Sequence, residues 1–142
     1  MIREKRSHTK ITGRPFFTGL LVAIRERFGD RVADIVAACS DTFEDPKPEW
    51  RKRKQAYIKH LRTADRSTLL VSAAGKLHNA RATLRELREH GPIVWQRFSA
   101  TRNDTLANYR NLIDAYQTAE TDARRAPIVE ELRDIVDRMS SI

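Results

Sequence analysis

Apolar residues recur at helical spacing along most of the chain, and this pattern limits the possible folds more than any other feature. The clearest series lies between residues 67 and 90, where the intervals are mainly three and four. Such intervals place the residues on one face of an α-helix. The series therefore predicts a long helix, capped by Ser67 and ended by Gly91 and Pro92. Its inward residues are Leu69, Leu70, Ala73, Leu77, Ala80, Leu84 and Leu87.

The same periodicity predicts helices through the rest of the chain. No segment shows sustained alternation of apolar and polar residues, and no Asn-Gly or Asp-Gly turn is present. The expected fold is therefore all-α, a single compact domain of six to seven helices. Asp30 and Asp104 are expected to cap two of them, and Pro48 and Pro127 to lie in first turns. The further helices are expected over residues 17–28, 30–39, 48–62, 92–98, 104–116 and 127–139.

Length and composition favour one domain in a reducing compartment. A chain of 142 residues can bury a core without disulfides. The one cysteine, Cys39, lies in an apolar helical run and is expected to be buried, which fits a cytoplasmic protein. We expect a basic segment over residues 1–20 and a helical domain over residues 21–142. Apolar residues 16–24 are too few to cross about 30 Å of hydrocarbon, so no membrane partner is expected.

The net charge of +8 comes from two segments. Residues 1–14 hold five basic residues and one acidic residue, and residues 47–62 hold seven basic residues and one acidic residue. The densest run is Arg51, Lys52, Arg53 and Lys54. Four consecutive helical residues spread through about 300°, so this run predicts a solvated helix more than a single basic face. Nucleic-acid binding through these four residues remains an alternative.

Several motifs occur in an order and spacing that resemble a known family. Ala74-Gly75-Lys76-Leu77-His78-Asn79 is similar to an Asp-(Lys/Arg)-Leu-His-Asn segment, and Arg27-Phe28-Gly29 to an Arg-Phe-Gly helix start. The loop Cys39–Pro48 and the segment Thr105-Leu106 with Tyr109-Arg110 also match. From about Ala23 to Met139, the chain resembles the HD superfamily of metal-dependent phosphohydrolases, in particular its small SpoT/RelA-type guanosine-polyphosphate hydrolase branch.

The resemblance implies an HD-domain-like fold and a divalent metal, typically manganese, that activates water. It also indicates that the metal centre is missing here. The family's last metal ligand is an Asp at the position of Gly75, and glycine has no donor atom. The family's first His and its His-Asp pair would precede Arg27, and residues 1–20 do not contain them. We therefore expect a truncated or degenerate copy with no catalytic residue, metal ligand or cofactor, or a start-site or frame artefact over residues 1–20.

At three positions, this sequence retains residues that the resemblance places in the family's nucleotide site. Asn79 matches an Asn that holds the nucleotide, Lys76 a neighbouring basic position, and Tyr109 an aromatic position near the pocket. We predict these three residues as substrate-binding, with a guanosine polyphosphate or another nucleotide as the ligand. The alternative is that Lys76 and Asn79 are solvated surface residues, that Tyr109 packs in the core, and that His78 is a core or ligand-supporting imidazole.

The sequence leaves three functions open and does not give the substrate or the oligomeric state. The favoured one is a phosphohydrolase-like protein without its metal centre, at most binding nucleotide. The alternatives are an active phosphohydrolase that uses substitute ligands such as Asp41, Glu44 or Asp45, or a second subunit, and a basic nucleic-acid-binding or scaffold protein. Gly75 itself costs a helix about 1 kcal/mol relative to Ala. Relaxed selection, or close approach by a neighbouring helix, would account for it.

Overall fold

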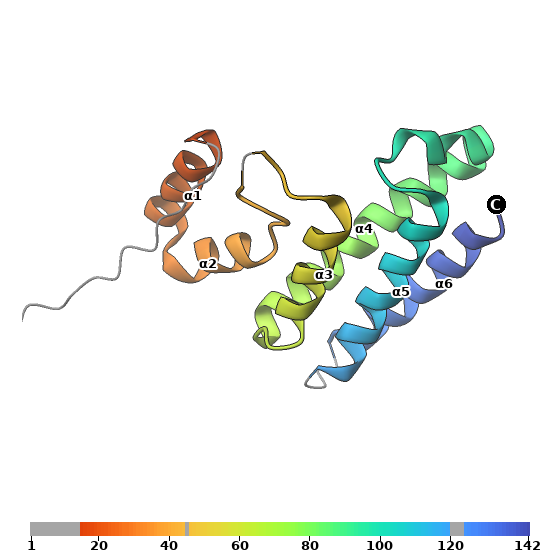
Figure 1. Cartoon of the computed structure of the whole chain (residues 1–142). Coiled ribbons are helices and arrows are strands. Elements are labelled where there is room, and N and C mark those ends of the chain that lie inside the picture. Colours follow the sequence, from red (N-terminus) through yellow and green to blue (C-terminus); the bar gives the residue numbers. More distant parts are fainter. Residues whose placement is uncertain (1–14, 45, 120–123) are drawn as a thin grey trace, which may run out of the picture. The chain divides into compact units, whose positions relative to one another are not determined.

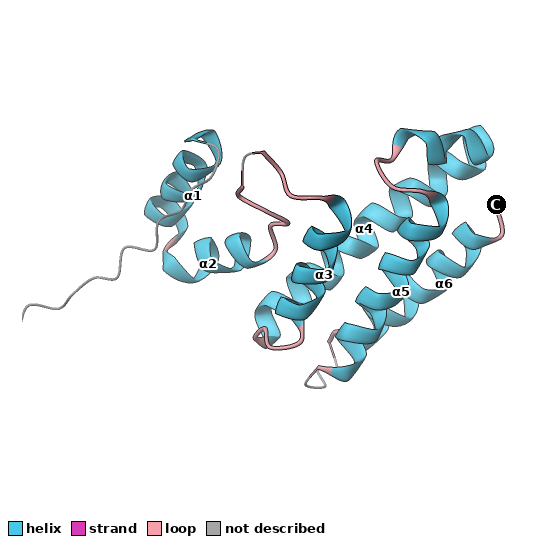
Figure 2. Ribbon diagram, viewed as in Figure 1, coloured by secondary structure: helices cyan, strands magenta, loops and turns pink. Residues whose placement is uncertain are grey.

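All regular structure in the described part of the chain is helical. A computed structural model describes residues 15–44, 46–119 and 124–142. These residues form six α-helices and one 3-10 helix, with no strand among them, which confirms the predicted all-α class and the number of helices (Figures 1 and 2). The described residues divide into two compact units, one that ends at Pro48 and one that begins at Glu49. The predicted domain boundary between residues 20 and 21 lies inside the first helix, and that division stays a prediction.

In the first unit, a glycine separates two helices that pack on each other, α1 (Pro15–Phe28) and α2 (Asp30–Ala38). Gly29 joins them at a φ of +87°, a left-handed conformation that glycine adopts without the cost of a side chain. Asp30 was expected to cap α2, and this was wrong. The N-cap residue is Gly29, and the Asp30 carboxylate instead accepts a hydrogen bond of 2.6 Å from Arg25.

Part of the predicted apolar stripe of the first unit is exposed. Leu20, Phe28 and Val32 have exposed fractions of 44%, 59% and 42%. The Arg27 guanidinium lies 5.5 Å from the centre of the Phe28 ring. Cys39 is half-buried rather than fully buried as expected. Helical spacing did not show which part of the apolar face is covered, and the expectation that Val32 is buried was wrong.

In the second unit, one long helix, α4 (Arg66–His90), packs against a short 3-10 helix, η1 (Gly91–Arg97), and against the last helix, α6 (Ala126–Ser140). Helix α6 also packs on α5, and α5 packs on α3. Figure 1 shows α4, α5 and α6 running alongside one another. The elements of this unit are α3 (Trp50–Leu61), α4 (Arg66–His90), η1 (Gly91–Arg97), α5 (Arg102–Thr118) and α6 (Ala126–Ser140).

The core of the second unit is mainly apolar and contains a short chain of hydrogen-bonded hydroxyl groups. Most of the predicted inward positions of α4, α5 and α6 are buried, which confirms the periodicity analysis. Within this core, the Ser72 hydroxyl, which was not predicted to face inward, is hydrogen-bonded to the hydroxyls of both Tyr57 and Tyr116, at 2.7 Å each. Ser72 therefore connects α4 to α3 and to α5. The largest fully buried side chains are Tyr116, Leu61, Leu69, Leu87, Leu112, Leu132, Met139, Val94 and Val136.

Three helix starts of the second unit differ from the predictions by two or three residues. Pro48 precedes the N-cap of α3, Glu49, and does not lie in the first turn of that helix. Helix α4 is capped by Asp65, whose carboxylate accepts from the Thr68 backbone N–H at 2.7 Å, and not by Ser67. Helix α5 is capped by Thr101, not by Asp104. The Thr101 hydroxyl accepts from the Asp104 N–H at 3.1 Å and donates to its carboxylate at 2.9 Å. Both caps satisfy N–H groups that a helix start leaves without partners.

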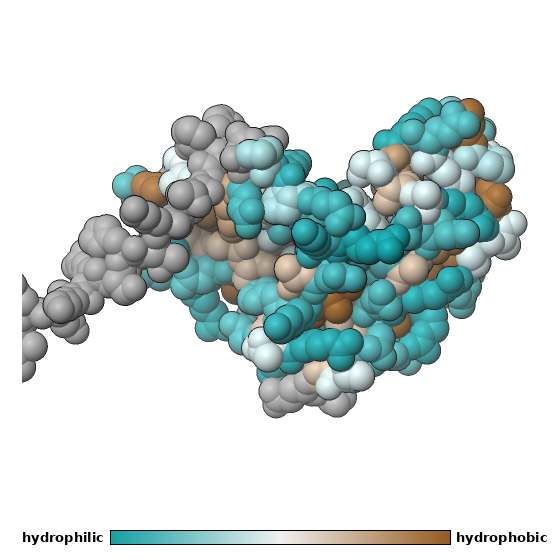
Figure 3. All heavy atoms as spheres, in the orientation of Figure 1, coloured by the Kyte–Doolittle hydropathy of each residue, from teal (hydrophilic) through white to brown (hydrophobic). Residues whose placement is uncertain are grey.

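The visible face of the second unit is mainly hydrophilic, with hydrophobic residues in separate patches (Figure 3). The exposed large hydrophobic side chains of the second unit, among its described residues, are Val71, Ile93 and Phe98. Within the ranges that the structure describes, no helix is long and apolar enough to cross a membrane.

Replacement of Ser72 by Ala should destabilise the second unit, because it removes a partner that two buried tyrosine hydroxyls share. We expect the free energy of unfolding to fall by about 1–3 kcal/mol, the usual cost of impairing buried hydrogen bonding. Urea titration followed by circular dichroism measures it. Ser141→Ala, at an exposed position, is the control and should change stability by less than about 0.5 kcal/mol. Equal effects of the two substitutions would contradict a stabilising role for the hydroxyl chain.

Candidate functional site

All three residues that were predicted to bind substrate line one pocket of the second unit. The pocket has a volume of about 150 Å³, and Lys76, Asn79 and Tyr109 are all in its wall. We call it the lysine pocket, because two lysines and no acidic residue are among the described residues that line it. Its lining residues are Trp50, Lys54, Lys76, Asn79, Phe98, Ser99, Ala100, Thr105, Asn108, Tyr109 and Leu112.

Helix α4 places Lys76 and Asn79 at the pocket because the residues beside them are anchored in the core. Leu77 is 6% exposed and Ala80 is fully buried. Position 79 follows position 76 by three in the sequence, so the two residues lie on the same side of the helix, next to the buried stripe. Lys76 is half-buried and Asn79 is exposed. The two polar side chains therefore lie at the edge of the core.

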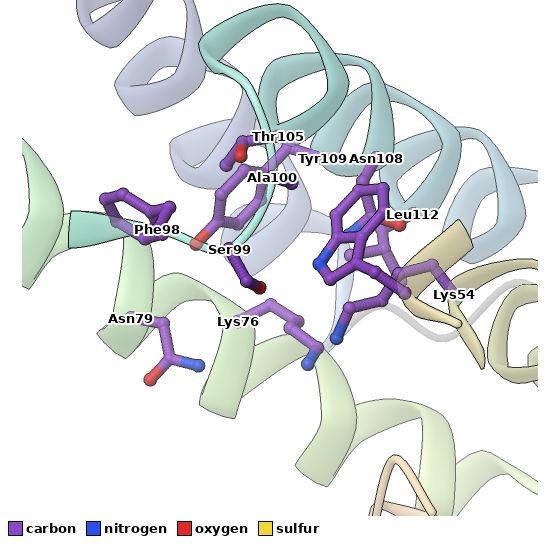
Figure 4. Close-up of a pocket in the computed structure, with 11 residues that line it drawn as sticks. Lys54, Lys76, Asn79, Phe98, Ser99, Ala100, Thr105, Asn108, Tyr109 and Leu112 are labelled. Atoms are coloured by element: carbon purple, nitrogen blue, oxygen red, sulfur yellow. The ribbon is translucent and has the colours of Figure 1, made fainter. Parts of the chain in front are cut away.

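Lys54 was not predicted as a site residue, yet it lines the same pocket from α3. In Figure 4, the side chains of Lys54 and Lys76 extend toward each other from α3 and α4, and both line the lysine pocket together with Ser99. Two ammonium groups that point to one place repel each other and favour an anion between them. Sequence reasoning assigned Lys54 to the basic run of α3, because no local motif connects it with Lys76.

The Lys76 ammonium group lies against an aromatic ring. Its nitrogen is 5.0 Å from the centre of the Tyr57 ring, within the range of a cation–π interaction. Tyr57 is itself held by the hydrogen bond to Ser72, one helical turn before Lys76 on α4. The position of this lysine is therefore supported by a buried side chain.

Tyr109 forms part of the buried wall of the lysine pocket. It is 8% exposed, and burial raises the pKa of its phenol to about 12. The group therefore stays protonated near neutral pH and can donate a hydrogen bond. Thr105, one turn earlier on α5, has a buried hydroxyl without a hydrogen-bond partner among the described residues. Tyr109 therefore packs in the core and also lines the pocket, and its role in binding substrate stays a prediction.

The basic run of α3 does not form one surface. Arg51 and Lys54 both face α5, where Arg51 donates to the carboxylate of Asp104 at 3.1 Å and Lys54 lines the lysine pocket. Lys52 and Arg53 are not in the pocket lining. Lys52 is exposed and Arg53 is half-buried. This divergence agrees with the expected spread of four consecutive helical residues.

A second ion pair connects the other end of α3 to α5. Arg62 donates to the carboxylate of Asp114 at 3.3 Å, with both side chains more than half exposed. Together with Arg51 and Asp104, this pair joins both ends of α3 to α5. The two pairs hold α3 in register along α5, where the pocket residues of the two helices face each other.

Comparison with known proteins identifies the family. A family model described as the HD domain matches residues 15–106, which is more than half of the chain. The chain belongs to the HD domain family. The crystal structure at 1.85 Å of lmo0812 from Listeria monocytogenes EGD-e is similar, with a TM-score of 0.70. The sequence identity is 23%, over 86% of this chain and 77% of that chain, so this likeness concerns the fold. A search of the curated proteins finds no match.

No steric constraint among the described residues requires a glycine at position 75 of this HD domain. Gly75 is exposed within α4, and a Cβ atom built there would meet nothing within 4 Å. Close approach by a neighbouring helix is therefore not the explanation among the described parts of the chain. His78 of the same motif is exposed, so it is not a core imidazole as one interpretation held.

The described residues of this HD domain do not fit the family's metal centre. Within residues 15–44, 46–119 and 124–142, no group of three or more His, Cys, Asp or Glu side chains could hold a metal ion. A catalytic divalent ion needs several converging ligands and an open position. Asp45, one of the substitute ligands considered from the sequence, lies outside the described residues. The absence of a metal cofactor stays a prediction.

Replacement of Gly75 by Ala should stabilise the HD domain, because alanine favours a helix and the space is open. We expect a gain of roughly 0.5–1 kcal/mol in the free energy of unfolding, measured by chemical denaturation. Gly91→Ala is the matched control. Gly91 has a φ of +71°, so a side chain there should reduce stability by about 1 kcal/mol. A loss of stability in Gly75→Ala would show that position 75 has a structural constraint.

The raised pKa of Tyr109 predicts a dependence of stability on alkaline pH. The folded protein holds this proton more tightly than the unfolded chain, in which the pKa is about 10. The resulting stability is complete below pH ~10 and is lost as the pH rises toward 12. Between pH 9 and pH 11, stability should fall more in the natural protein than in Tyr109→Phe, as measured by urea titration at each pH. Equal falls in the two proteins would contradict the assignment.

Proposed function

We propose that this HD-domain protein binds a phosphorylated nucleotide, such as a guanosine polyphosphate, in the lysine pocket. We propose further that it does not hydrolyse this ligand by the metal-dependent reaction of its family. The protein is in this sense a phosphohydrolase-like binding protein. The observation that carries the proposal is the convergence of Lys54 and Lys76 on one pocket.

The chemistry of the pocket supports an anionic ligand. Lysine ammonium groups bind phosphate as point charges, and each has three donors. The same wall adds the Asn79 amide, the Ser99 hydroxyl and the protonated Tyr109 phenol. These groups supply hydrogen bonds to phosphate or sugar oxygens without adding negative charge. Asn79, Lys76 and Tyr109 are also the positions at which the resemblance to guanosine-polyphosphate hydrolases is kept.

The proposal of an inactive site rests on the donor atoms of the chain. The family's last ligand position is occupied by Gly75, which has no side-chain donor. The described lining residues of the lysine pocket include neither a carboxylate nor an imidazole, the groups that most often act as general base. Within the described residues, nothing takes over the role of the missing ligand.

Calorimetric titration with guanosine tetraphosphate at low ionic strength tests the proposal. We expect binding by the natural protein and a loss of affinity of roughly tenfold or more in Lys54→Ala and in Lys76→Ala. Each of these substitutions removes a charge-assisted interaction, which is worth about 1.5–3 kcal/mol. Lys52→Ala is the matched control, since Lys52 is exposed on the same helix and lies outside the pocket lining.

Two outcomes would contradict this function. If no heat develops at millimolar nucleotide, or if Lys52→Ala weakens binding as much as Lys54→Ala, the lysine pocket is not a nucleotide site. If the purified protein releases pyrophosphate or phosphate from guanosine tetraphosphate in the presence of manganese, the protein is an active phosphohydrolase. Inactive Lys76→Ala would then show that the reaction takes place in this pocket.

A further inference from the structure

A second pocket adjoins the lysine pocket, between α3 and α5. It has a volume of about 220 Å³. It shares Trp50, Lys54 and Asn108 with the lysine pocket, so the two cavities have one continuous wall. We call it the amide groove, after the three amide side chains in its lining. Its lining residues are Trp50, Arg51, Lys54, Gln55, Ile58, Asp104, Ala107, Asn108 and Asn111.

The sizes of the two cavities indicate that a nucleotide would need both. Sites for molecules of drug size have volumes of about 300–1,000 Å³. The lysine pocket, at about 150 Å³, can accept phosphate groups but is small for a complete nucleotide. The amide groove begins at Lys54 and Trp50, where the lysine pocket ends. A ligand held by its phosphates in the first cavity can therefore extend into the second.

The chemistry of the amide groove differs from that of the lysine pocket. Trp50 offers a half-buried aromatic surface at the boundary between the two. Gln55, Asn108 and Asn111 add three neutral amides, each with an acceptor oxygen and donor N–H groups. The charged residues Arg51 and Asp104 are paired with each other at 3.1 Å. An aromatic surface with neutral donors and acceptors suits a planar heterocycle better than a second phosphate.

We propose that the amide groove is a base subsite, in which a purine ring stacks on Trp50 while its edge meets the amides. The phosphates of the same ligand reach Lys54 and Lys76. This inference rests on the proposed nucleotide binding and adds to it the orientation of the ligand. Stacking on an aromatic side chain is worth about 1–3 kcal/mol per base. We therefore expect a nucleotide to bind much more tightly than its phosphate groups alone.

Calorimetry with two probes, GDP and inorganic pyrophosphate, separates the two subsites, because both probes carry a diphosphate and only GDP carries a base. The natural protein should bind GDP at least about fivefold more tightly than pyrophosphate. Trp50→Leu should remove this preference, because it should weaken the binding of GDP much more than that of pyrophosphate, although Trp50 also lines the lysine pocket. Trp50→Phe, which keeps an aromatic ring, should retain most of the preference. GDP should also quench tryptophan fluorescence in the natural protein but much less in Trp50→Phe, since the other tryptophan, Trp95, is buried.

A second variant protects the test against misfolding of Trp50→Leu. Asn111 is exposed and lines only the amide groove, so Asn111→Leu should fold and should weaken GDP binding several-fold without affecting pyrophosphate. If GDP and pyrophosphate bind equally to the natural protein, the base subsite is wrong and the lysine pocket stands. If GDP is preferred but neither substitution reduces that preference, the base lies elsewhere. If neither probe binds, the proposed function fails as well.

Discussion

The burial of one face of α4 is the constraint on which the second unit depends. Ala73 and Ala80 are fully buried, so neighbouring side chains can pack closely against the helix. The same helix contacts η1 and α6 and is hydrogen-bonded through Ser72 to α3 and α5. Because the turn per residue of a helix is fixed, burial of this face also determines where the polar residues beside it lie. The core and the lysine pocket are thus two consequences of one helix orientation.

The sequence predicted the helices of the second unit well, because each buries a stripe at helical spacing. It was less accurate at helix starts. Asp65 and Ser67 are both good capping residues two positions apart, and periodicity does not distinguish them. It also did not predict that Leu20 and Phe28 of the first unit would be largely exposed. Spacing shows which side chains share a face, whereas coverage depends on contacts between elements that are distant in sequence.

The candidate site was predictable only in part. The resemblance to a known family pointed to Lys76, Asn79 and Tyr109, and the fold brings these three residues to one cavity. Lys54 was missed because its contribution depends on the packing of α3, which no short motif describes. The sequence around Lys54 contained one indication that Lys54 faces the core, because Trp50, Lys54 and the buried Tyr57 lie on one side of the predicted helix. Residues that act together from different helices become visible only when the helices are assembled.

The two ion pairs at the ends of α3 have a further consequence for any ligand between α3 and α5. Both pairs, Arg51 with Asp104 and Arg62 with Asp114, are largely exposed to solvent. Dissolved ions weaken such pairs, and they also weaken the attraction between an anion and Lys54 or Lys76. A rise in ionic strength thus weakens the ion pairs that join α3 to α5, and it also weakens the attraction of the two lysines for an anion. The dependence of binding on salt concentration should accordingly be steeper than the two lysines alone would produce.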